Sequence, residues 1–153
     1  MADVLAGQHI ALVALDNGQS AAVLVKPVAD DLFVVSAIPH EAYGISYLDV
    51  IAAHREASGH LRSSGIIRKS GHRTVRVALT EPGRNAELRV QILDQLGSLG
   101  CTAEYDSASG QMLVDLPPDC AVGPLVAYLA PLGFPWEVAD PPDGFGLRDA
   151  VSE

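Results

Sequence analysis

Residues 66–79 read IIRKSGHRTVRVAL, and the spacing of apolar residues changes within this stretch. Before it, short apolar segments are separated by turn residues every eight to twelve positions, a pattern typical of consecutive antiparallel strands. After Gly71, strand-like segments alternate with segments whose apolar residues recur at helical spacing. The change of period predicts an α+β chain built in two parts, with the boundary near Gly71.

Residues 8–70 are predicted to form a small antiparallel β-barrel-like unit. The segments HIALVAL and SAAVLVKPV flank Asn17 and Gly18, a pair that supplies the positive φ angles of a tight hairpin. The segments YLDVIAAHRE and HLRSSGIIRK flank a second turn at residues 57–59. Between the strand DLFVVSAI and this second pair lies PHEAYGIS, residues 39–46, an irregular loop of the kind on which binding sites are often built.

Residues 71–140 are predicted to form a ferredoxin-like unit with the order β-α-β-β-α-β, in which two helices pack on one face of an antiparallel sheet. Its strands are the segments TVRVALTE, CTAEYDS, QMLVDLP and FPWEVADP. The first helix is predicted from an apolar stripe at helical spacing, formed by Leu88, Ile92, Leu96 and Leu99. Asn85 is expected to cap this helix and Gly100 to end it.

A second helix is expected over residues 121–132, opened by Asp119 and weakened in its last turn by Pro131. Residues 141–153 read PPDGFGLRDAVSE and are predicted to form a flexible acidic tail that is dispensable for folding, because their prolines and glycines leave little that forms a regular element.

Composition excludes several classes of protein. The apolar runs are far shorter than the roughly 20 residues that span a bilayer, and Asp3 stands where a secretory signal carries positive charge, so no membrane association and a cytoplasmic location are predicted. Cys101 and Cys120 lie nineteen residues apart without a CxxC motif, which favours reduced buried thiols over a zinc site. No metal and no cofactor are expected.

Two segments, AIPHEAYGISYLDVIAA and SGIIRKSGHRTVRV, resemble the uncharacterised bacterial family called domain of unknown function 4265, over roughly residues 23–138. The family pattern is N-x-P-F-x-x-x-G-x-x-x-x-D-x-V followed by SGH-x-T-x-R. The matching positions are Pro39, Gly44, Asp49 and His72. Ser36 or Ala37 and His40 stand where the family has Asn and Phe, which implies a divergent member. Because the family has no established activity, the resemblance implies the two-part architecture and no substrate.

Basic residues are concentrated in one part of an acidic chain. The net charge is −9, and residues 55–89 contain eight Lys+Arg against three Asp+Glu, whereas residues 94–153 contain one against ten. These charges either pair with neighbouring acids on solvated faces or form a site for a carboxylate or phosphate. The ligand-binding candidates are Tyr43, Ser70, Arg73 and Arg76. Nucleic acid is not expected as a partner, because the predicted sheet has few aromatic residues and its flanks are acidic.

General acid–base catalysis is one functional hypothesis. The catalytic candidates are His40, Asp49 and His72, with a histidine oriented by Asp49 as base and an arginine stabilising negative charge. His40 lies on the irregular loop and His72 at the boundary of the two parts, so the hypothesis requires these two segments to face each other. The sequence contains no GxSxG or HExxH motif that would indicate nucleophilic or metal chemistry.

Binding is the favoured function. The sequence indicates a soluble, acidic binding or interaction module of the immunity, adaptor or regulatory type, with an anion-binding groove predicted at the junction of its two parts. Its predicted partner is a protein or a small anionic ligand. The alternative is a small cofactor-independent enzyme that acts on an anionic small molecule by His/Asp general acid–base chemistry. Gly71 is expected at the boundary between the two parts, where the backbone requires a residue without a Cβ.

Overall fold

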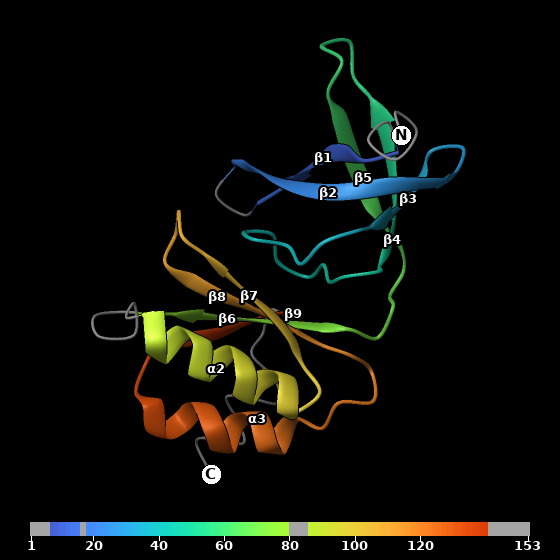
Figure 1. Cartoon of the computed structure of the whole chain (residues 1–153). Helices are drawn as coiled ribbons and strands as arrows, with labels where there is room; N and C mark the ends of the chain where they lie inside the picture. Colours follow the sequence, from blue (N-terminus) through green and yellow to red (C-terminus); the bar gives the residue numbers. More distant parts are fainter. Residues whose placement is uncertain (1–6, 16–17, 80–85, 141–153) are drawn as a thin grey trace. The chain divides into compact units, whose positions relative to one another are not determined.

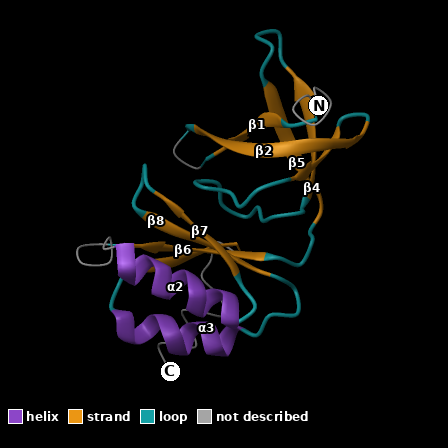
Figure 2. Ribbon diagram, in the orientation of Figure 1, coloured by secondary structure: helices purple, strands orange, loops and turns teal. Residues whose placement is uncertain are grey.

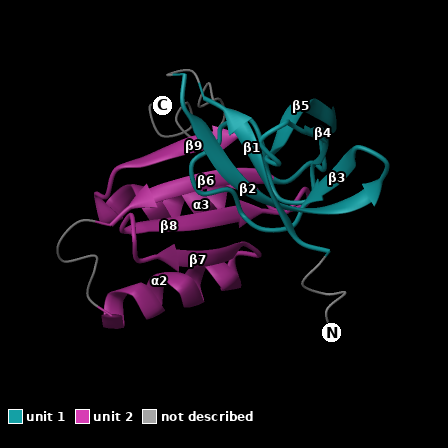
Figure 3. Cartoon of the chain, turned by 90° about the horizontal axis from the view of Figure 1, so that it is seen from above, with its two compact units in different colours: residues 1–72 teal, residues 73–153 magenta. Residues whose placement is uncertain are grey.

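The computed structural model describes residues 7–15, 18–79 and 86–140. The chain divides into two compact units, residues 1–72 and residues 73–153, which are coloured separately in Figure 3. The described residues of the first unit form strands, and those of the second unit form strands and helices (Figure 2). The predicted α+β class is confirmed.

The first unit is a barrel in which each strand pairs with the next one along the chain (Figure 1). Its strands within the described residues are β1 (His9–Ala14), β2 (Ser20–Ala29), β3 (Leu32–Val35), β4 (Val50–Arg55) and β5 (Leu61–Arg68). The barrel closes where β1 pairs with β5. This closing pair is parallel, whereas antiparallel pairing was predicted throughout. In a barrel of consecutive antiparallel neighbours with an odd number of strands, the first and last strands run in the same direction.

Apolar residues at every second position fill this barrel, as the pleat of a strand requires. In β2, Ala21, Val23 and Val25 are buried while the residues between them are exposed. Two residues of the connection between β3 and β4, Ala42 and Ile45, belong to the same apolar cluster. The loop of residues 36–49 is therefore anchored in the barrel core.

Gly18 takes the left-handed conformation that the sequence predicted for its turn, and Gly59 takes the same conformation in the second predicted turn. Gly18 has a φ of 82° and Gly59 a φ of 90°, and the second of these turns is closed by hydrogen bonds between Glu56 and His60 and between Gly59 and Glu56. Gly71, at the end of the first unit, has a φ of 93°. Asn17 lies outside the described residues.

The second unit is a sheet with helices packed on one face (Figures 1 and 2). In chain order its elements are β6 (Arg73–Ala78), α2 (Ala86–Ser98), β7 (Thr102–Asp106), β8 (Gln111–Leu116), α3 (Val122–Leu129), the 3₁₀ helix η1 (Ala130–Leu132) and β9 (Trp136–Asp140). The described strands pair antiparallel in the order β7-β8-β6-β9. Alternate residues of β6, Val75 and Val77, face the helices in one apolar cluster with Ile92 and Leu96 of α2.

The end of α2 lies at the predicted glycine, whereas the start of α3 does not have the predicted cap. Gly100 has a φ of 90°, and the N–H of Cys101 returns to the carbonyl of Leu96 at 3.0 Å, which ends α2. The N-cap of α3 is Ala121, without a side-chain hydrogen bond, so the assignment of Asp119 as the opening cap is wrong. A hydrogen bond from the N–H of Cys120 to the carbonyl of Pro117 closes a turn ahead of the helix, and Asp119 lies within that turn.

The last turn of the second helix is altered by proline, as predicted. Residues 130–132 continue α3 as the 3₁₀ helix η1, with Pro131 within it and Gly133 at a φ of 77° directly after it. Asn85 and the predicted tail of residues 141–153 lie outside the described residues. None of the helices in the described ranges combines the length and the hydropathy needed to cross a bilayer.

Candidate functional site

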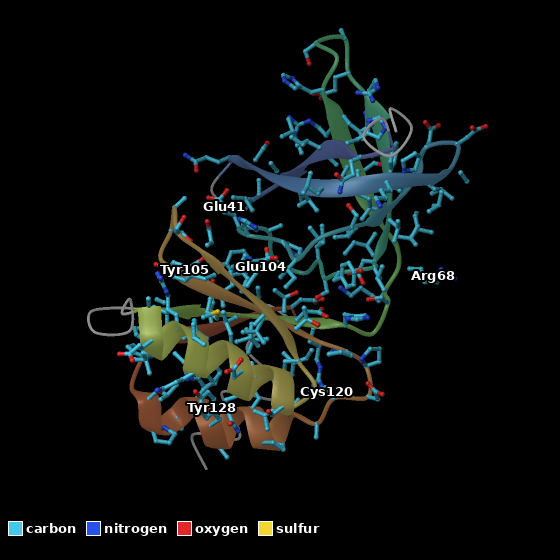
Figure 4. The ribbon with its side chains drawn as sticks, viewed as in Figure 1. Glu41, Arg68, Glu104, Tyr105, Cys120 and Tyr128 are labelled. Carbon is cyan, nitrogen blue, oxygen red and sulfur yellow. The ribbon has the colours of Figure 1, made fainter. Side chains whose placement is uncertain are left out.

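The loop of residues 36–49 contains two kinds of side chain: buried ones that anchor it and exposed ones that face solvent. Ala42 and Ile45 are buried in the barrel core, whereas His40, Glu41 and Tyr43 are exposed. Glu41 is labelled on this loop in Figure 4. The loop has no regular secondary structure, so its shape depends on these buried residues and on the hydrogen bonds that hold its end.

Asp49 is the polar anchor of the loop. Its side chain is completely buried, and among the described residues its carboxylate accepts hydrogen bonds from three donors. Oδ2 accepts from the N–H of Ser46 at 2.9 Å and from Nζ of Lys69 at 2.6 Å, and Oδ1 accepts from the N–H of Ser70 at 2.7 Å. A buried carboxylate is stable only when charge and hydrogen-bond donors compensate its lost hydration, and these donors supply both.

Lys69 holds the loop at two positions. Its Nζ also donates to the carbonyl of Gly44 at 3.0 Å, and Gly44 has a φ of 77°. We call the group Gly44, Ser46, Asp49, Lys69 and Ser70 the Asp49 clamp. The clamp ties the segment between β3 and β4 to the segment that follows β5.

The clamp continues to His72 through the serine hydroxyl. The Oγ of Ser70 donates to the carbonyl of Tyr47 at 2.7 Å and accepts from the N–H of His72 at 3.1 Å. The imidazole of His72 packs edge-on against the ring of Tyr47, with centroids 5.5 Å apart and an interplanar angle of 90°. The structure thus brings together three of the predicted site residues: Asp49, Ser70 and His72.

The catalytic hypothesis required Asp49 to orient a histidine. Within the described residues, the donors to its carboxylate are Lys69 and two backbone N–H groups, and neither imidazole is among them. His40 lies elsewhere on the loop and lines a cavity of about 230 Å³, together with residues that include Leu24, Ile38 and Glu41. Tyr43 is 47% exposed.

Arg73 and Arg76 lie on β6 in the second unit. They are three residues apart on a strand, so their side chains leave opposite faces of the sheet. Arg73 donates to the carbonyl of Cys120 at 3.0 Å, and Nε of Arg76 lies 3.3 Å from Oε2 of Glu137, its register partner on β9. Arg76 is 2% exposed. The two guanidinium groups therefore do not converge on one anion.

Sequence reasoning missed Lys69, Ser46 and Tyr47. Lys69 was one charge in a basic segment, and nothing in its immediate neighbours indicated a buried carboxylate twenty residues earlier. The available signal was the co-occurrence of two motif segments, one that contains Asp49 and one that begins at Ser70, since segments that meet in the fold are constrained together.

Comparison with known proteins gives a family and a fold. The family model described as Domain of unknown function (DUF4265) matches residues 22–133. No curated protein sequence matches the chain. The chain is similar to a solved structure described as a novel crystal structure of a hypothetical protein from Neisseria gonorrhoeae, with a TM-score of 0.67 and 18% sequence identity, covering 91% of this chain and 97% of the other. At that identity the likeness concerns the fold alone. The matched region includes the whole Asp49 clamp, and the chain belongs to the DUF4265 family.

Proposed function

We propose that the chain is a protein-binding module of the immunity, adaptor or regulatory type, and that it contacts its partner through the loop of residues 36–49. The observation that carries this proposal is that the loop combines buried side chains, which fix its backbone, with exposed side chains. Buried Ala42, Ile45 and Asp49 hold the backbone, while exposed His40 and Tyr43 are presented to solvent. A surface that is fixed before binding loses less conformational freedom when the partner binds.

The chemistry of the presented surface suits a polypeptide. Tyrosine combines a large apolar area with a hydroxyl and has few rotatable bonds, which makes it an effective contact residue at interfaces. The nearby cavity is lined mainly by apolar residues, with His40 and Glu41 as its polar members. Such a cavity accepts an apolar side chain, and Glu41 favours a basic residue beside it.

The enzyme hypothesis ranks second. It needs a general base whose protonation is tuned by a neighbour, and Asp49 was the carboxylate proposed for that role. Its hydrogen bonds to Lys69 and to two backbone N–H groups in the described structure support a role in folding. The anion-binding groove predicted at the junction of the two units stays a prediction.

We also assign the second unit to the ferredoxin-like plan. The chain order β6-α2-β7-β8-α3-β9 and the sheet order β7-β8-β6-β9 support this assignment, since a β-α-β-β-α-β unit of this plan places its first and third strands at the centre of the sheet. The boundaries predicted from the sequence, residues 8–70 and 71–140, are retained as part of the proposal.

Alanine variants with affinity-purification readouts test the binding role. His40→Ala and Tyr43→Ala are expected to leave thermal unfolding nearly unchanged. When the tagged chain is purified from the cells that produce it, the partner protein that co-purifies with the wild-type chain should be lost from both variants. Val90→Ala is the matched control, because Val90 is also exposed, at 56%, and lies on α2 in the second unit. Retention of the same partner by both loop variants would overturn the assignment of the loop as the contact surface.

A further inference from the structure

Cys101 and Cys120 are in contact although they are nineteen residues apart. Their sulfur atoms lie 3.7 Å from each other, and both side chains are buried in the apolar cluster of the second unit. Cys101 follows the last turn of α2. Cys120, which is labelled in Figure 4, precedes α3. The pair therefore links the end of one helix to the segment that leads into the next.

Separate backbone contacts hold each cysteine in place. The N–H of Cys101 donates to the carbonyl of Leu96 at 3.0 Å, and the N–H of Cys120 donates to the carbonyl of Pro117 at 2.9 Å. The guanidinium of Arg73 donates to the carbonyl of Cys120 at 3.0 Å. Because both backbones are fixed, the sulfur contact is a property of the fold, and a rotation about each Cα–Cβ bond changes the distance between the sulfurs.

Metal binding does not explain the pair. The described residues contain no group of three or more His, Cys, Asp or Glu side chains that could hold a metal ion. A structural zinc site needs about four ligands, so two thiols alone do not form one. The chemistry that remains for two touching thiols is oxidation to a disulfide.

We propose that Cys101 and Cys120 form a reversible intramolecular disulfide by exchange with a small disulfide of the glutathione type. In the first step the Cys120 thiolate attacks the small disulfide, whose S–S bond breaks to release one small thiolate. In the second step the sulfur of Cys101 attacks the sulfur of Cys120, and the second small thiolate leaves. The two protein thiols are oxidised by two electrons, the small disulfide is reduced to two thiols, and the protons lost by the protein appear on those thiols.

The order of the two steps follows from accessibility. Cys120 is 9% exposed and Cys101 is 6% exposed, and Cys120 is flanked by the exposed residues Asp119 and Ala121. Burial, together with a hydrogen bond to Cys120, raises the pKa of the Cys101 thiol to about 12. Cys101 therefore reacts second, when the mixed disulfide on Cys120 already lies beside it.

The disulfide would close a covalent ring around the β7–β8 hairpin. A cross-link of this length restricts the unfolded chain more than the folded one and so stabilises the second unit. We infer that an oxidising environment makes the connection between α2 and α3 more resistant to unfolding, and that a reducing environment reverses the change.

The test equilibrates the full-length protein with mixtures of reduced and oxidised glutathione, blocks free thiols with iodoacetamide and measures the intact mass. The proposal predicts a native population that has lost two hydrogens and carries neither glutathione nor the alkyl group. The equilibrium constant for this disulfide should be at least about 10-fold larger in native buffer than in concentrated urea, and the melting temperature should rise by about 5 °C or more on oxidation.

Single variants separate the two steps. Cys101→Ser should retain glutathione on Cys120 as a stable adduct, whereas Cys120→Ser should react at least about 10-fold more slowly with oxidised glutathione, since its remaining thiol is the less reactive one. Equal equilibrium constants in native buffer and in urea, or oxidation that yields only mixed disulfides or linked dimers, would overturn the proposal.

Discussion

The carboxylate of Asp49 and the ammonium group of Lys69 meet at 2.6 Å, and the carboxylate is completely buried while the lysine side chain is 44% exposed. The contact joins residues twenty positions apart, and Lys69 holds the second half of the loop that presents His40 and Tyr43, at Gly44 and at Asp49. Since the lysine remains in contact with water, most of the stabilisation comes from the hydrogen bonds that satisfy the carboxylate, not from the charge pair alone.

Replacement of Asp49 should destabilise the first unit. Asp49→Ala leaves the N–H groups of Ser46 and Ser70 without their acceptor and Lys69 without its counter-charge, and we expect a loss of about 2–4 kcal/mol in the free energy of unfolding. Urea denaturation monitored by circular dichroism measures it. Asp30→Ala is the matched control, because Asp30 is exposed, and it should change stability by less than about 0.5 kcal/mol. Similar effects of the two variants would contradict the role given to the clamp.

The Asp49–Lys69 pair should be energetically coupled. Lys69→Met alone should cost less than Asp49→Asn alone, because the lysine is partly exposed and water replaces part of what it donates. In a double-mutant cycle we expect a coupling of about 1 kcal/mol. Additive effects within about 0.3 kcal/mol would show that the short contact contributes nothing of its own.

Gly44 should tolerate alanine poorly for a purely conformational reason. Its φ is 77°, and a Cβ added there would meet no atom within 4 Å, so Gly44→Ala should cost about 1–2 kcal/mol through backbone strain alone. Gly97→Ala is the contrasting substitution, since Gly97 lies within α2, has no positive φ and also has open space around it. It should stabilise the chain by about 0.5–1 kcal/mol. Thermal unfolding of both variants should therefore shift in opposite directions.

The neutral tautomer of His9 is determined by its neighbour. The guanidinium of Arg55 lies 3.1 Å from Nδ1 of His9, and an arginine can only donate hydrogen bonds. Nδ1 must therefore be the acceptor, and in the neutral ring the proton sits on Nε2. Nitrogen NMR of the imidazole at a pH where the ring is neutral should show this tautomer, and Arg55→Ala should allow the mixture of tautomers found in a free histidine. A proton on Nδ1 in the wild-type chain would contradict the geometry.

Local patterns predicted most of the fold. The change of apolar period after Gly71 separated the barrel from the mixed unit, and the stripe containing Ile92 and Leu96 located α2. These signals are local, because strands and helices repeat over a few residues. The cap of α3 was missed because Asp119 is a good capping residue by type, while a turn ahead of the helix placed Ala121 at that position.

The site was harder to predict because its contacts are long-range. Lys69, Arg73 and Arg76 are close in sequence, but each has a different partner. Lys69 contacts Asp49, Arg73 donates to the carbonyl of Cys120, and Arg76 contacts Glu137. The sequence alone predicts that the two arginines are separated. Side chains alternate between the two faces of a strand, so residues three positions apart lie on opposite faces. The burial of Asp49 could not be predicted in this way, because two of its three donors, Nζ of Lys69 and the N–H of Ser70, come from the segment that follows β5.

The central claim, that the loop of residues 36–49 is the contact surface for a protein partner, is tested most directly by a photo-reactive amino acid placed at position 43. In the cells that produce the chain, irradiation should yield one discrete adduct containing a second protein, and the same substitution at position 90 on α2 should not yield it. Adding Asp49→Ala, which releases the end of the loop, should weaken the adduct at position 43. Equal labelling at positions 43 and 90, or no protein adduct at position 43, would contradict the account.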